Sequence, residues 1–439
     1  MPKSQFDVVI IGGGQAGIPL AYGLAKAGQS VALVERLHLG GSCANFGCTP
    51  TKAAIASARV AHAARRGAEF GLKIPIVEVD FPKVIERARG VALESRNGLD
   101  RGFEGTENPK LVRGNARIEG RTGGGFRVAI DDLHLTAKQV VLNTGTRSTI
   151  PRISGLEKIP YLTSENWPDQ TELPEHLAII GGGYIGLEMG QFYSRMGSRV
   201  TIWQNGPRVV EHEDDEISAA LQQFLEAEGI QFHLNAKLES TAQLGAAHVF
   251  VATGRTPNTD GMGLETVGVN LDQRGFVKVD PALKTNVEGI WAAGDIRGGP
   301  LFTHTSWDDF RILLSQMTGD GSRTTVRIVP YAIFTDPELG RVGLTESEAG
   351  ESGARFHVAK FEMKKNGKAR EIGEPEGFIK VLLEDDSGEI LGAAVLASDG
   401  AELIHMYVDI MNAGASARVI RDAIHIHPTL AEAVQSAVS

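Results

Sequence analysis

A glycine-rich supersecondary pattern occurs twice in the chain, and this repeat constrains the fold more than any other feature. In the first copy a short apolar run, Asp7 to Ile11, leads into Gly12-Gly13-Gly14-Gln15-Ala16-Gly17, a helical stretch and a second apolar run. The second copy begins 169 residues later, with Gly181-Gly182-Gly183-Tyr184-Ile185-Gly186 between an apolar run and a helical stretch. Strand, glycine turn, helix and strand in this order predict a βαβ unit that binds a dinucleotide. Two such units predict an α/β chain with two Rossmann-like nucleotide-binding domains.

The glycines of each copy have a physical role in nucleotide binding. They let the backbone approach a pyrophosphate at the N-terminus of the helix, where N–H groups and the helix dipole favour negative charge. In the first copy the second strand ends on Glu35, whose carboxylate can accept a hydrogen bond from a ribose hydroxyl. An isolated glycine motif is weak evidence, but the complete pattern is specific. We therefore expect one dinucleotide at Gly12, Gly14, Gly17 and Glu35, and another at Gly181, Gly183 and Gly186.

In the second copy, Gln204 occupies the position that corresponds to Glu35. A glutamine lacks the carboxylate that would repel the 2′-phosphate of NADPH, and Arg208 follows just beyond it. This pair favours NADPH over NADH. Two alternatives stay open: Gln204 can still hydrogen-bond the ribose hydroxyl of NADH, and Arg208 can be an ordinary solvated charge.

The two cysteines of the chain, Cys43 and Cys48, lie five residues apart, directly after the first βαβ unit. A structural zinc site needs about four ligands, more than two cysteines supply. A disulfide that closes so short a loop would constrain the unfolded chain little, and cytosolic thiols are normally kept reduced. A redox-active dithiol remains as the interpretation. Pro50 suits the first turn of a helix expected over residues 52–66, so Cys48 would lie near a helix N-terminus that favours its thiolate.

Taken together, the motifs resemble the class I pyridine nucleotide-disulfide oxidoreductases, which include dihydrolipoamide dehydrogenase, glutathione reductase and mercuric reductase. The likeness runs from about residue 6 to residue 435 and keeps the family's order. It implies two Rossmann-like domains followed by a C-terminal α+β dimerisation domain. Besides the two glycine fingerprints, the motifs that carry it are Cys43-Ala44-Asn45-Phe46-Gly47-Cys48, Ala292-Ala293-Gly294-Asp295 and His427-Pro428-Thr429-Leu430-Ala431-Glu432.

The resemblance also implies how the chain is divided. Each nucleotide-binding domain would close with a strand and a turn, at Gly145 in the first and Gly254 in the second. Where the chain returns to the first domain, Gly294 and Asp295 would contact FAD, with Asp295 on the ribitol. The expected segments are residues 1–150 for the FAD-binding domain with the dithiol, 151–280 for the NAD(P)-binding domain, 281–325 for the return to the FAD-binding domain and 326–439 for the dimerisation domain.

The family's chemistry implies a role for each catalytic residue. NADPH or NADH would reduce FAD, and FAD would reduce the disulfide between Cys43 and Cys48. Cys48 would be the thiolate beside the flavin, and Cys43 would exchange with substrate. His427, oriented by Glu432, would be the acid/base toward the thiols. The other implied contacts are an ion pair of Lys52 with Glu188 beside the flavin, and Tyr184 over the nicotinamide pocket.

Three histidines bear on how the active site is assembled. In the family the His-Glu pair of one subunit reaches the dithiol of its partner, so the resemblance implies a homodimer with shared active sites, in which His427 crosses the interface. His304 is either a contact to the pyrimidine edge of the flavin or a capping or packing residue. His425 is either a packing residue or, with His427, part of a metal site; our assignment contains no metal.

Composition excludes other classes of protein. The net charge of −10 argues against a nucleic-acid-binding surface. No apolar run approaches the length of a membrane span, and Met1 to Phe6 leaves no room for a signal sequence before the first strand. We therefore expect a soluble cytoplasmic enzyme that binds neither nucleic acid nor membrane.

The electron acceptor is the least constrained part of the prediction. The residues around the cysteines, Asn45-Phe46 and Thr49-Pro50-Thr51, resemble mercuric-reductase-like enzymes, whereas the His-Pro-Thr segment resembles dihydrolipoamide dehydrogenase. Gln435 to Ser439 lacks the cysteine pair with which mercuric reductases pass metal inward. We expect a mercuric-reductase-like oxidoreductase that acts on a small disulfide, lipoamide, Hg(II) or Cu(II), with dihydrolipoamide dehydrogenase as the alternative. An alternative of another class is a nucleotide-binding flavoprotein without catalysis, which would not need both cysteines, His427 and Glu432 together.

Overall fold

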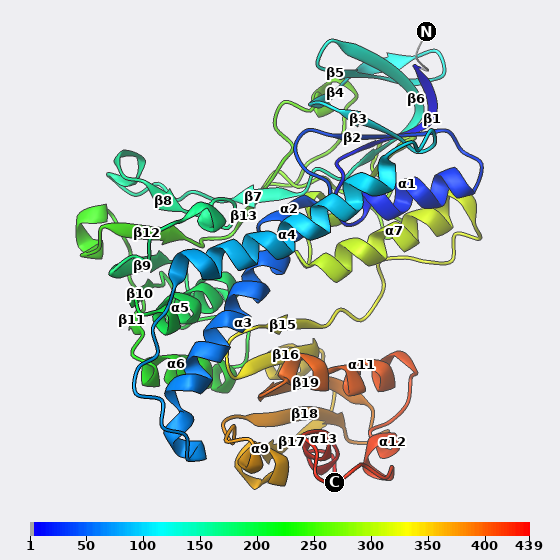
Figure 1. Ribbon diagram of the computed structural model, residues 1–439. Coiled ribbons are helices and arrows are strands. Elements are labelled where there is room, and N and C mark those ends of the chain that lie inside the picture. The colour runs from blue at the N-terminus through cyan, green and yellow to red at the C-terminus, as the bar shows by residue number, and fades with distance from the viewer. Residues whose placement is uncertain (1–3) are drawn as a thin grey trace.

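Three large β-sheets organise residues 4–439, the part of the chain that the computed structural model describes (Figure 1). Two of them consist mainly of parallel strands with helices against them, and the third is antiparallel. In Figure 1 the first sheet lies at the top, the second at the left and the third at the bottom. Residues 1–3, part of the segment used to argue against a signal sequence, lie outside the described residues.

The first sheet has the strand order β3-β2-β1-β6-β5-β4, and β14 also pairs with β6. Strand β1 is buried on both faces, since Val8 and Ile10 pack into one core and Val9 and Ile11 into another, as expected for a parallel sheet covered on both sides. Because β14 follows β6 by well over a hundred residues, the chain returns to this sheet after building the second one. The strands are β1 (Gln5–Ile11), β2 (Val31–Glu35), β3 (Lys110–Arg113), β4 (Ala116–Thr122), β5 (Gly125–Ile130), β6 (Leu133–Leu142) and β14 (Ile290–Ala292).

Helices of this first domain carry the segments that become the site. Helix α1 packs beside α7, while α3 packs against α4 and also against α5 of the second domain. Helix α3 therefore brings the residues that follow the cysteines to the junction of the two domains. The helices are α1 (Gly17–Lys26), α2 (Gly41–Asn45), α3 (Cys48–Arg65), α4 (Phe81–Phe103) and α7 (Thr303–Thr318).

The second sheet, in the order β11-β10-β9-β12-β8, repeats the arrangement of the first around the second glycine fingerprint. A short antiparallel pair, β7 with β13, connects the two domains. The elements are β8 (Tyr161–Leu162), β9 (His176–Ile180), α5 (Tyr184–Met196), β10 (Arg199–Trp203), α6 (Asp215–Ala227), β11 (Gln231–His233) and β12 (His248–Val251), with β7 (Thr146–Ser148) and β13 (Arg255–Pro257) between the domains.

The first glycine of each fingerprint has the same backbone conformation and the same lack of space for a side chain. Gly12 and Gly181 both have φ +111°, a conformation that side chains rarely adopt. A Cβ on Gly12 would lie 2.2 Å from the carbonyl oxygen of Asn143, and one on Gly181 would lie 2.3 Å from that of Ala252. Each turn therefore runs against the end of the neighbouring strand and needs glycine.

The third sheet is antiparallel, in the order β15-β16-β19-β18-β17, and forms a C-terminal α+β domain. Helices α10 and α11 of this domain are separated only by Ile404. The elements are β15 (Tyr331–Ile333), β16 (Glu338–Gly343), α8 (Glu346–Glu351), β17 (Phe356–Glu362), α9 (Gly367–Glu371), β18 (Phe378–Glu384), β19 (Ile390–Ala397), α10 (Gly400–Leu403), α11 (His405–Asn412), α12 (Arg418–Arg421) and α13 (Ala431–Ser436).

These sheets confirm the predicted fold class, two Rossmann-like domains with a C-terminal α+β domain. The domain boundaries at residues 150, 280 and 325 stay a prediction. Within residues 4–439, none of the helices combines the length and the apolar character that a membrane crossing requires.

Candidate active site

A single cavity of about 1350 Å³ runs from the first glycine turn to the cysteines. Ligand pockets usually measure roughly 300–1,000 Å³, so this cavity has room for a large cofactor together with a second ligand. Residues of the first domain, the second domain and the third domain form its walls, the last from the segment around β15 and from α10 and α11. The sequence-predicted residues that line it are Gly12, Gly14, Glu35, Cys43, Cys48, Lys52, Gly145, Tyr184, Glu188, Asp295 and His304.

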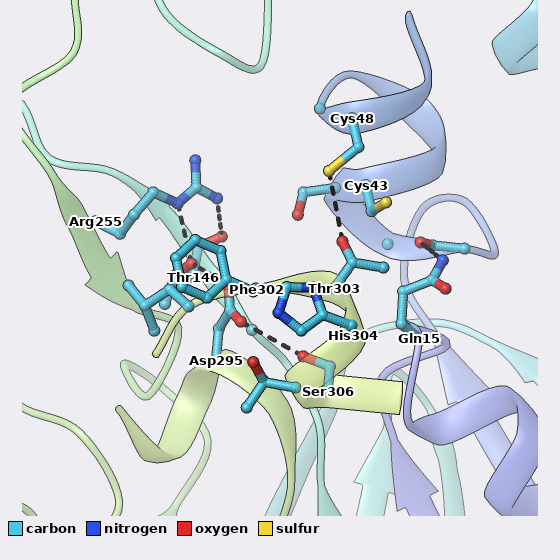
Figure 2. Close-up of a pocket in the computed structure, with 18 of the residues that line it drawn as sticks. Gln15, Cys43, Cys48, Thr146, Arg255, Asp295, Phe302, Thr303, His304 and Ser306 are labelled. Atoms are coloured by element: carbon cyan, nitrogen blue, oxygen red, sulfur yellow. Dashed lines mark hydrogen bonds between the residues drawn. The ribbon is translucent and has the colours of Figure 1, made fainter. Parts of the chain in front are cut away.

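The two cysteines lie at the wall of this cavity as free thiols, Cys43 partly exposed and Cys48 exposed to the cavity. Helix α3 begins at Cys48, four residues earlier than the helix expected over residues 52–66, because Pro50 fits within its first turn. The Cys48 Sγ lies 3.5 Å from the Thr303 Oγ1 at the start of α7 (Figure 2). The thiol therefore lies at one helix N-terminus and contacts the first residue of another.

The two thiols differ in pKa because their surroundings differ. Hydrogen bonding between the two raises the pKa of Cys43 well above its ordinary value and lowers that of Cys48 to about 6. Burial opposes the decrease at Cys48, while Lys52 and Thr303 add to it. Cys48 is thus the thiolate of the reduced pair at neutral pH, and Cys43 needs a base before it can act as a nucleophile.

We expect the alkylation rate of Cys48 by iodoacetamide to rise with pH with a midpoint at about 6, because only the thiolate reacts. Thr303→Val should move this midpoint upward, since the hydroxyl that stabilises the thiolate is lost. Thr305→Val is the matched control, because the Thr305 Oγ1 is buried without a hydrogen-bond partner. Mass spectrometry of the reduced protein measures the alkylation of each cysteine separately. A midpoint near pH 9 for Cys48 of the wild-type chain would contradict the assignment of Cys48 as the thiolate.

Lys52 and Glu188 join the first two domains beside the thiols. The Lys52 Nζ donates to the Glu188 Oε2 at 2.7 Å, and Glu188 is 4% exposed. Burial lowers the pKa of Lys52, but Glu188 and the Cys48 thiolate outweigh burial and raise it overall. The backbone N–H of Phe334 donates to the Glu188 Oε1 at 2.9 Å, and the Phe334 ring centroid lies 4.6 Å from the Lys52 Nζ. Phe334 lies beyond β15, so the third domain also holds the pair in place.

The walls near the first glycine turn suit an adenine dinucleotide. The Glu35 carboxylate accepts from the N–H groups of Gly13 and Leu37, both at 2.7 Å, which fixes it at the cavity wall. Asn143 bridges the turn, since its Oδ1 accepts from the Gly17 N–H at 2.9 Å and its Nδ2 donates to the Ala293 carbonyl at 2.8 Å. Both oxygens of Glu35 keep free lone pairs for ribose hydroxyls.

Asp295 lines the same cavity just beyond the end of β14. Its carboxylate accepts from the Thr146 hydroxyl at 3.2 Å and from the Ser306 hydroxyl at 3.5 Å (Figure 2). Burial raises the pKa of this carboxyl, although Arg255 opposes the increase. The adjacent Gly294 has φ +72°, and its N–H donates to Asp309 at 2.7 Å. These contacts point the end of β14 toward the cavity.

An aromatic cluster borders the cavity at the start of α7. Phe302 stacks on His304, with ring centroids 5.3 Å apart, and on Tyr331, with centroids 5.4 Å apart. Phe302 and His304 line the same cavity as the two cysteines, and Figure 2 shows all four side chains. His304 hydrogen-bonds the Pro330 carbonyl at 2.7 Å, and burial lowers its pKa. The ring centroids of Tyr184 and Phe302 lie 6.1 Å apart, and burial raises the pKa of Tyr184 to about 12.

The second fingerprint lies outside this cavity, on the neighbouring sheet. Gly181 and Gly183 lie in the turn ahead of α5, and Gly186 lies in the first turn of this helix. Helix α5 presents Tyr184 and Glu188 to the cavity. Gly254 follows β12 in a left-handed conformation, φ +111°. Gln204 accepts from the Gly182 N–H at 2.8 Å, and Arg208 forms an ion pair of 2.7 Å with Asp215.

His427 and Glu432 form a pair that lies away from the cavity of the same chain. The His427 Nδ1 lies 2.9 Å from the Glu432 Oε1, and Glu432 also accepts from the Thr429 N–H at 2.9 Å. The His427 side chain is 76% exposed. Figure 1 shows this C-terminal segment at the bottom of the molecule, far below α2. Within residues 4–439, no group of three or more His, Cys, Asp or Glu side chains is placed to hold a metal ion, so His425 and His427 have no third ligand.

Sequence reasoning missed three residues of this site. Thr303 contacts Cys48 across 255 positions, and no local pattern indicates that contact. Phe334 has no signal beyond its place in an apolar run. Asn143 could have been found, because it follows the strand beside the first glycine turn, where its side chain reaches the backbone of that turn.

Comparison with known proteins gives a family and several relatives. Residues 6–309 match the family described as pyridine nucleotide-disulphide oxidoreductase, and residues 329–438 match its dimerisation domain. The chain is 32% identical to the probable pyridine nucleotide-disulfide oxidoreductase RclA of Escherichia coli over 99% of both proteins. It is 34% identical to a dihydrolipoyl dehydrogenase of Chlorobaculum tepidum, over 99% of this chain and 96% of that protein.

Solved structures agree with these matches. The Cu(II) complex of the HOCl-induced flavoprotein disulfide reductase RclA from Escherichia coli is similar with a TM-score of 0.90 at 32% identity, covering 100% of this chain and 99% of that one. The structure of the same reductase described without Cu(II) has a TM-score of 0.88 at 32% identity and covers 98% of both chains. The matches do not support the specifically mercuric-reductase-like enzyme expected from the residues around the cysteines.

Proposed function

The chain belongs to the pyridine nucleotide-disulphide oxidoreductase family, and we propose that it uses NADPH or NADH to reduce a small disulfide or a metal ion at Cys43 and Cys48. It is a flavin-dependent disulfide reductase. The observation that carries the proposal is the state of the thiols at the cavity wall. Cys48 is stabilised as a thiolate by Cys43, Lys52 and Thr303, while Cys43 is not.

The residues that line the cavity are suited to bind FAD. The turn at Gly12 leaves no space for a side chain, Glu35 offers a fixed carboxylate, and Asp295 lines the same cavity. These residues would hold the cofactor, with Gly14 at the pyrophosphate and the N-terminus of α7 toward the flavin. When bound, FAD supplies the transfer of an electron pair from a reduced nicotinamide to the disulfide.

The chain's own chemistry is thiol–disulfide exchange. At neutral pH, reduction of the Cys43–Cys48 disulfide takes two electrons and one proton and gives the Cys43 thiol and the Cys48 thiolate. Cys43, once deprotonated, attacks a substrate disulfide, so that the substrate S–S bond breaks, one thiolate leaves and a mixed disulfide forms. The Cys48 thiolate then attacks the Cys43 sulfur, restores the Cys43–Cys48 disulfide and releases the second substrate thiol. With metal ions the same pair would give up two electrons, enough for one Hg(II) or two Cu(II).

The base for Cys43 would come from the second subunit. The dimerisation-domain match indicates a homodimer, and His427 projects from the surface of that domain, held by Glu432. Ile424 and Ile426, on either side of His425, are 101% and 79% exposed, as expected for a segment that a partner covers. His427 of the partner subunit would accept the Cys43 proton and return it to the leaving thiolate.

Two acceptor classes are supported by the relatives. One relative is named a dihydrolipoyl dehydrogenase, and the structure of another is described as a Cu(II) complex. We propose to measure oxidation of NADH and NADPH with lipoamide, glutathione disulfide, Hg(II) and Cu(II) side by side, each with the wild-type chain and with Cys48→Ser. At least one acceptor should be reduced more than tenfold faster by the wild type. Equal rates for the two proteins with every acceptor would overturn the proposed function.

A further inference from the structure

The side chain of Gln204 is bound at both ends. Its Oε1 accepts from the Gly182 N–H at 2.8 Å, as the Glu35 Oε2 accepts from the Gly13 N–H at 2.7 Å in the first domain. Gln204 therefore occupies the place of the ribose-binding acid in the second domain. Its Nε2 points the other way and donates to the Glu211 Oε1 at 2.9 Å.

Glu211 reaches this position because of a glycine between the two residues. A Cβ on Gly206 would lie 1.2 Å from the Glu211 Oε1, so the Glu211 side chain folds across Gly206 toward Gln204. In the bend that follows β10, the Glu211 carboxylate thus occupies the space beside Gly206 where another residue would have a side chain. The negative charge that position 204 lacks is supplied from seven residues further along the chain.

Arg208, the cation expected to attract a 2′-phosphate, is already engaged. Its Nη1 lies 2.7 Å from Asp215, and its Nη2 donates to the Glu211 backbone carbonyl at 2.9 Å. It is the only lysine or arginine from residue 204 to residue 216, a stretch that also contains five acidic residues. Two of these, Glu213 and Asp214, are buried against Arg341 and Lys380 of the third domain. Glu216 pairs with Lys360 of the third domain, and Asp215 and Glu211 are exposed on the bend.

We infer that Glu211 acts with Gln204 as the specificity-determining group of the nucleotide site and makes NADH the preferred reductant. The ribose 2′-hydroxyl of NADH can donate to a carboxylate at this position, whereas the 2′-phosphate of NADPH would be repelled by it. This reverses the preference for NADPH predicted from Gln204 and Arg208. The inference rests on the proposed use of a reduced nicotinamide nucleotide.

Steady-state kinetics with both nucleotides test the inference. We expect the wild type to have at least a tenfold higher kcat/KM for NADH than for NADPH. Glu211→Gln should reduce this ratio at least tenfold, because it removes the charge and keeps the shape of the side chain. Asp215→Asn should reduce it less, by releasing Arg208. Glu226→Gln, near the far end of α6, is the matched control and should leave the ratio unchanged. A ratio that Glu211→Gln does not alter would overturn the inference.

Binding of nucleotide fragments separates this inference from the proposed reaction. Calorimetry with 5′-AMP and 2′,5′-ADP requires no turnover and probes only the ribose position. Wild type should bind 5′-AMP more tightly, and Glu211→Gln should favour 2′,5′-ADP relative to wild type. If neither nucleotide supports acceptor reduction but these affinities hold, the proposed function fails, while the assignment of Glu211 as the group that selects the ribose stands. Tighter binding of 2′,5′-ADP by the wild type, or no binding of either fragment, would overturn the inference.

Discussion

Replacing Cys48 with serine is expected to abolish acceptor reduction while FAD remains bound. The serine hydroxyl cannot form a disulfide with Cys43, and the thiolate held by Lys52 and Thr303 is lost. We expect kcat to fall by about 10³-fold or more, as when a covalent nucleophile is removed. The long-wavelength absorbance between a thiolate and FAD, seen after partial reduction of the wild type, should disappear. Steady-state rates and an anaerobic absorbance titration measure the two effects.

The control for this prediction is Ser57→Ala, which changes a side chain of the same helix outside the cavity. It should keep both the activity and the absorbance band. FAD content and Tm of the Cys48→Ser protein should match the wild type, because nothing in the fold depends on that thiol. A Cys48→Ser protein that retains a tenth or more of the wild-type rate would exclude Cys48 from the reaction.

Two inactive variants, Cys43→Ser and His427→Ala, are expected to restore activity when their subunits are mixed. His427→Ala alone should lower kcat by about 10²–10⁴-fold, the range for loss of a general acid/base. In a mixed dimer one site contains both defects and the other contains neither, if each site takes its cysteines and its histidine from different chains. Random exchange of equal amounts makes about half of the dimers mixed, so about a quarter of wild-type activity should return.

This experiment distinguishes the two possible origins of the base. If His427 served the cysteines of its own chain, every site of a mixed dimer would carry one defect and no activity would return. Native mass spectrometry of differently tagged subunits must first show that exchange has occurred. A mixture of Cys43→Ser with Cys48→Ser is the control. Each chain of this mixture lacks one cysteine of its own dithiol, so neither site of a mixed dimer has an intact pair and no activity should return.

The sequence was sufficient to predict the parts of the fold that depend on local pattern. The glycines at Gly12 and Gly181 predicted two similar turns because only a residue without a side chain fits them, and both have the same φ of +111°. The position of Cys48 at a helix N-terminus followed from Pro50, although the helix begins earlier than expected. The two Rossmann-like domains were predicted from these patterns, and the C-terminal α+β domain was implied by the resemblance to the family; the fold class and the family are both confirmed.

What could not be predicted depends on contacts between distant segments or on the path of a bend. Thr303 approaches Cys48 only because α7 belongs to a segment that returns to the first domain after the second has been built. Glu211 reaches Gln204 only because its side chain passes over Gly206, which has no side chain of its own. Neither contact has a periodic signal. The absence of a carboxylate at position 204 therefore gave a preference for NADPH that the proposed role of Glu211 reverses.

The central claim is that the Cys43–Cys48 pair stores the electron pair that the acceptor receives. The direct measurement is anaerobic reduction of the air-oxidised holoenzyme with NADH or NADPH, followed by alkylation and mass spectrometry of the two cysteines. We predict that two equivalents of nucleotide are consumed per chain and that both cysteines become alkylated. Consumption of one equivalent, with FAD reduced and neither cysteine alkylated, would contradict the claim and identify a flavoprotein whose cysteines take no part in electron transfer.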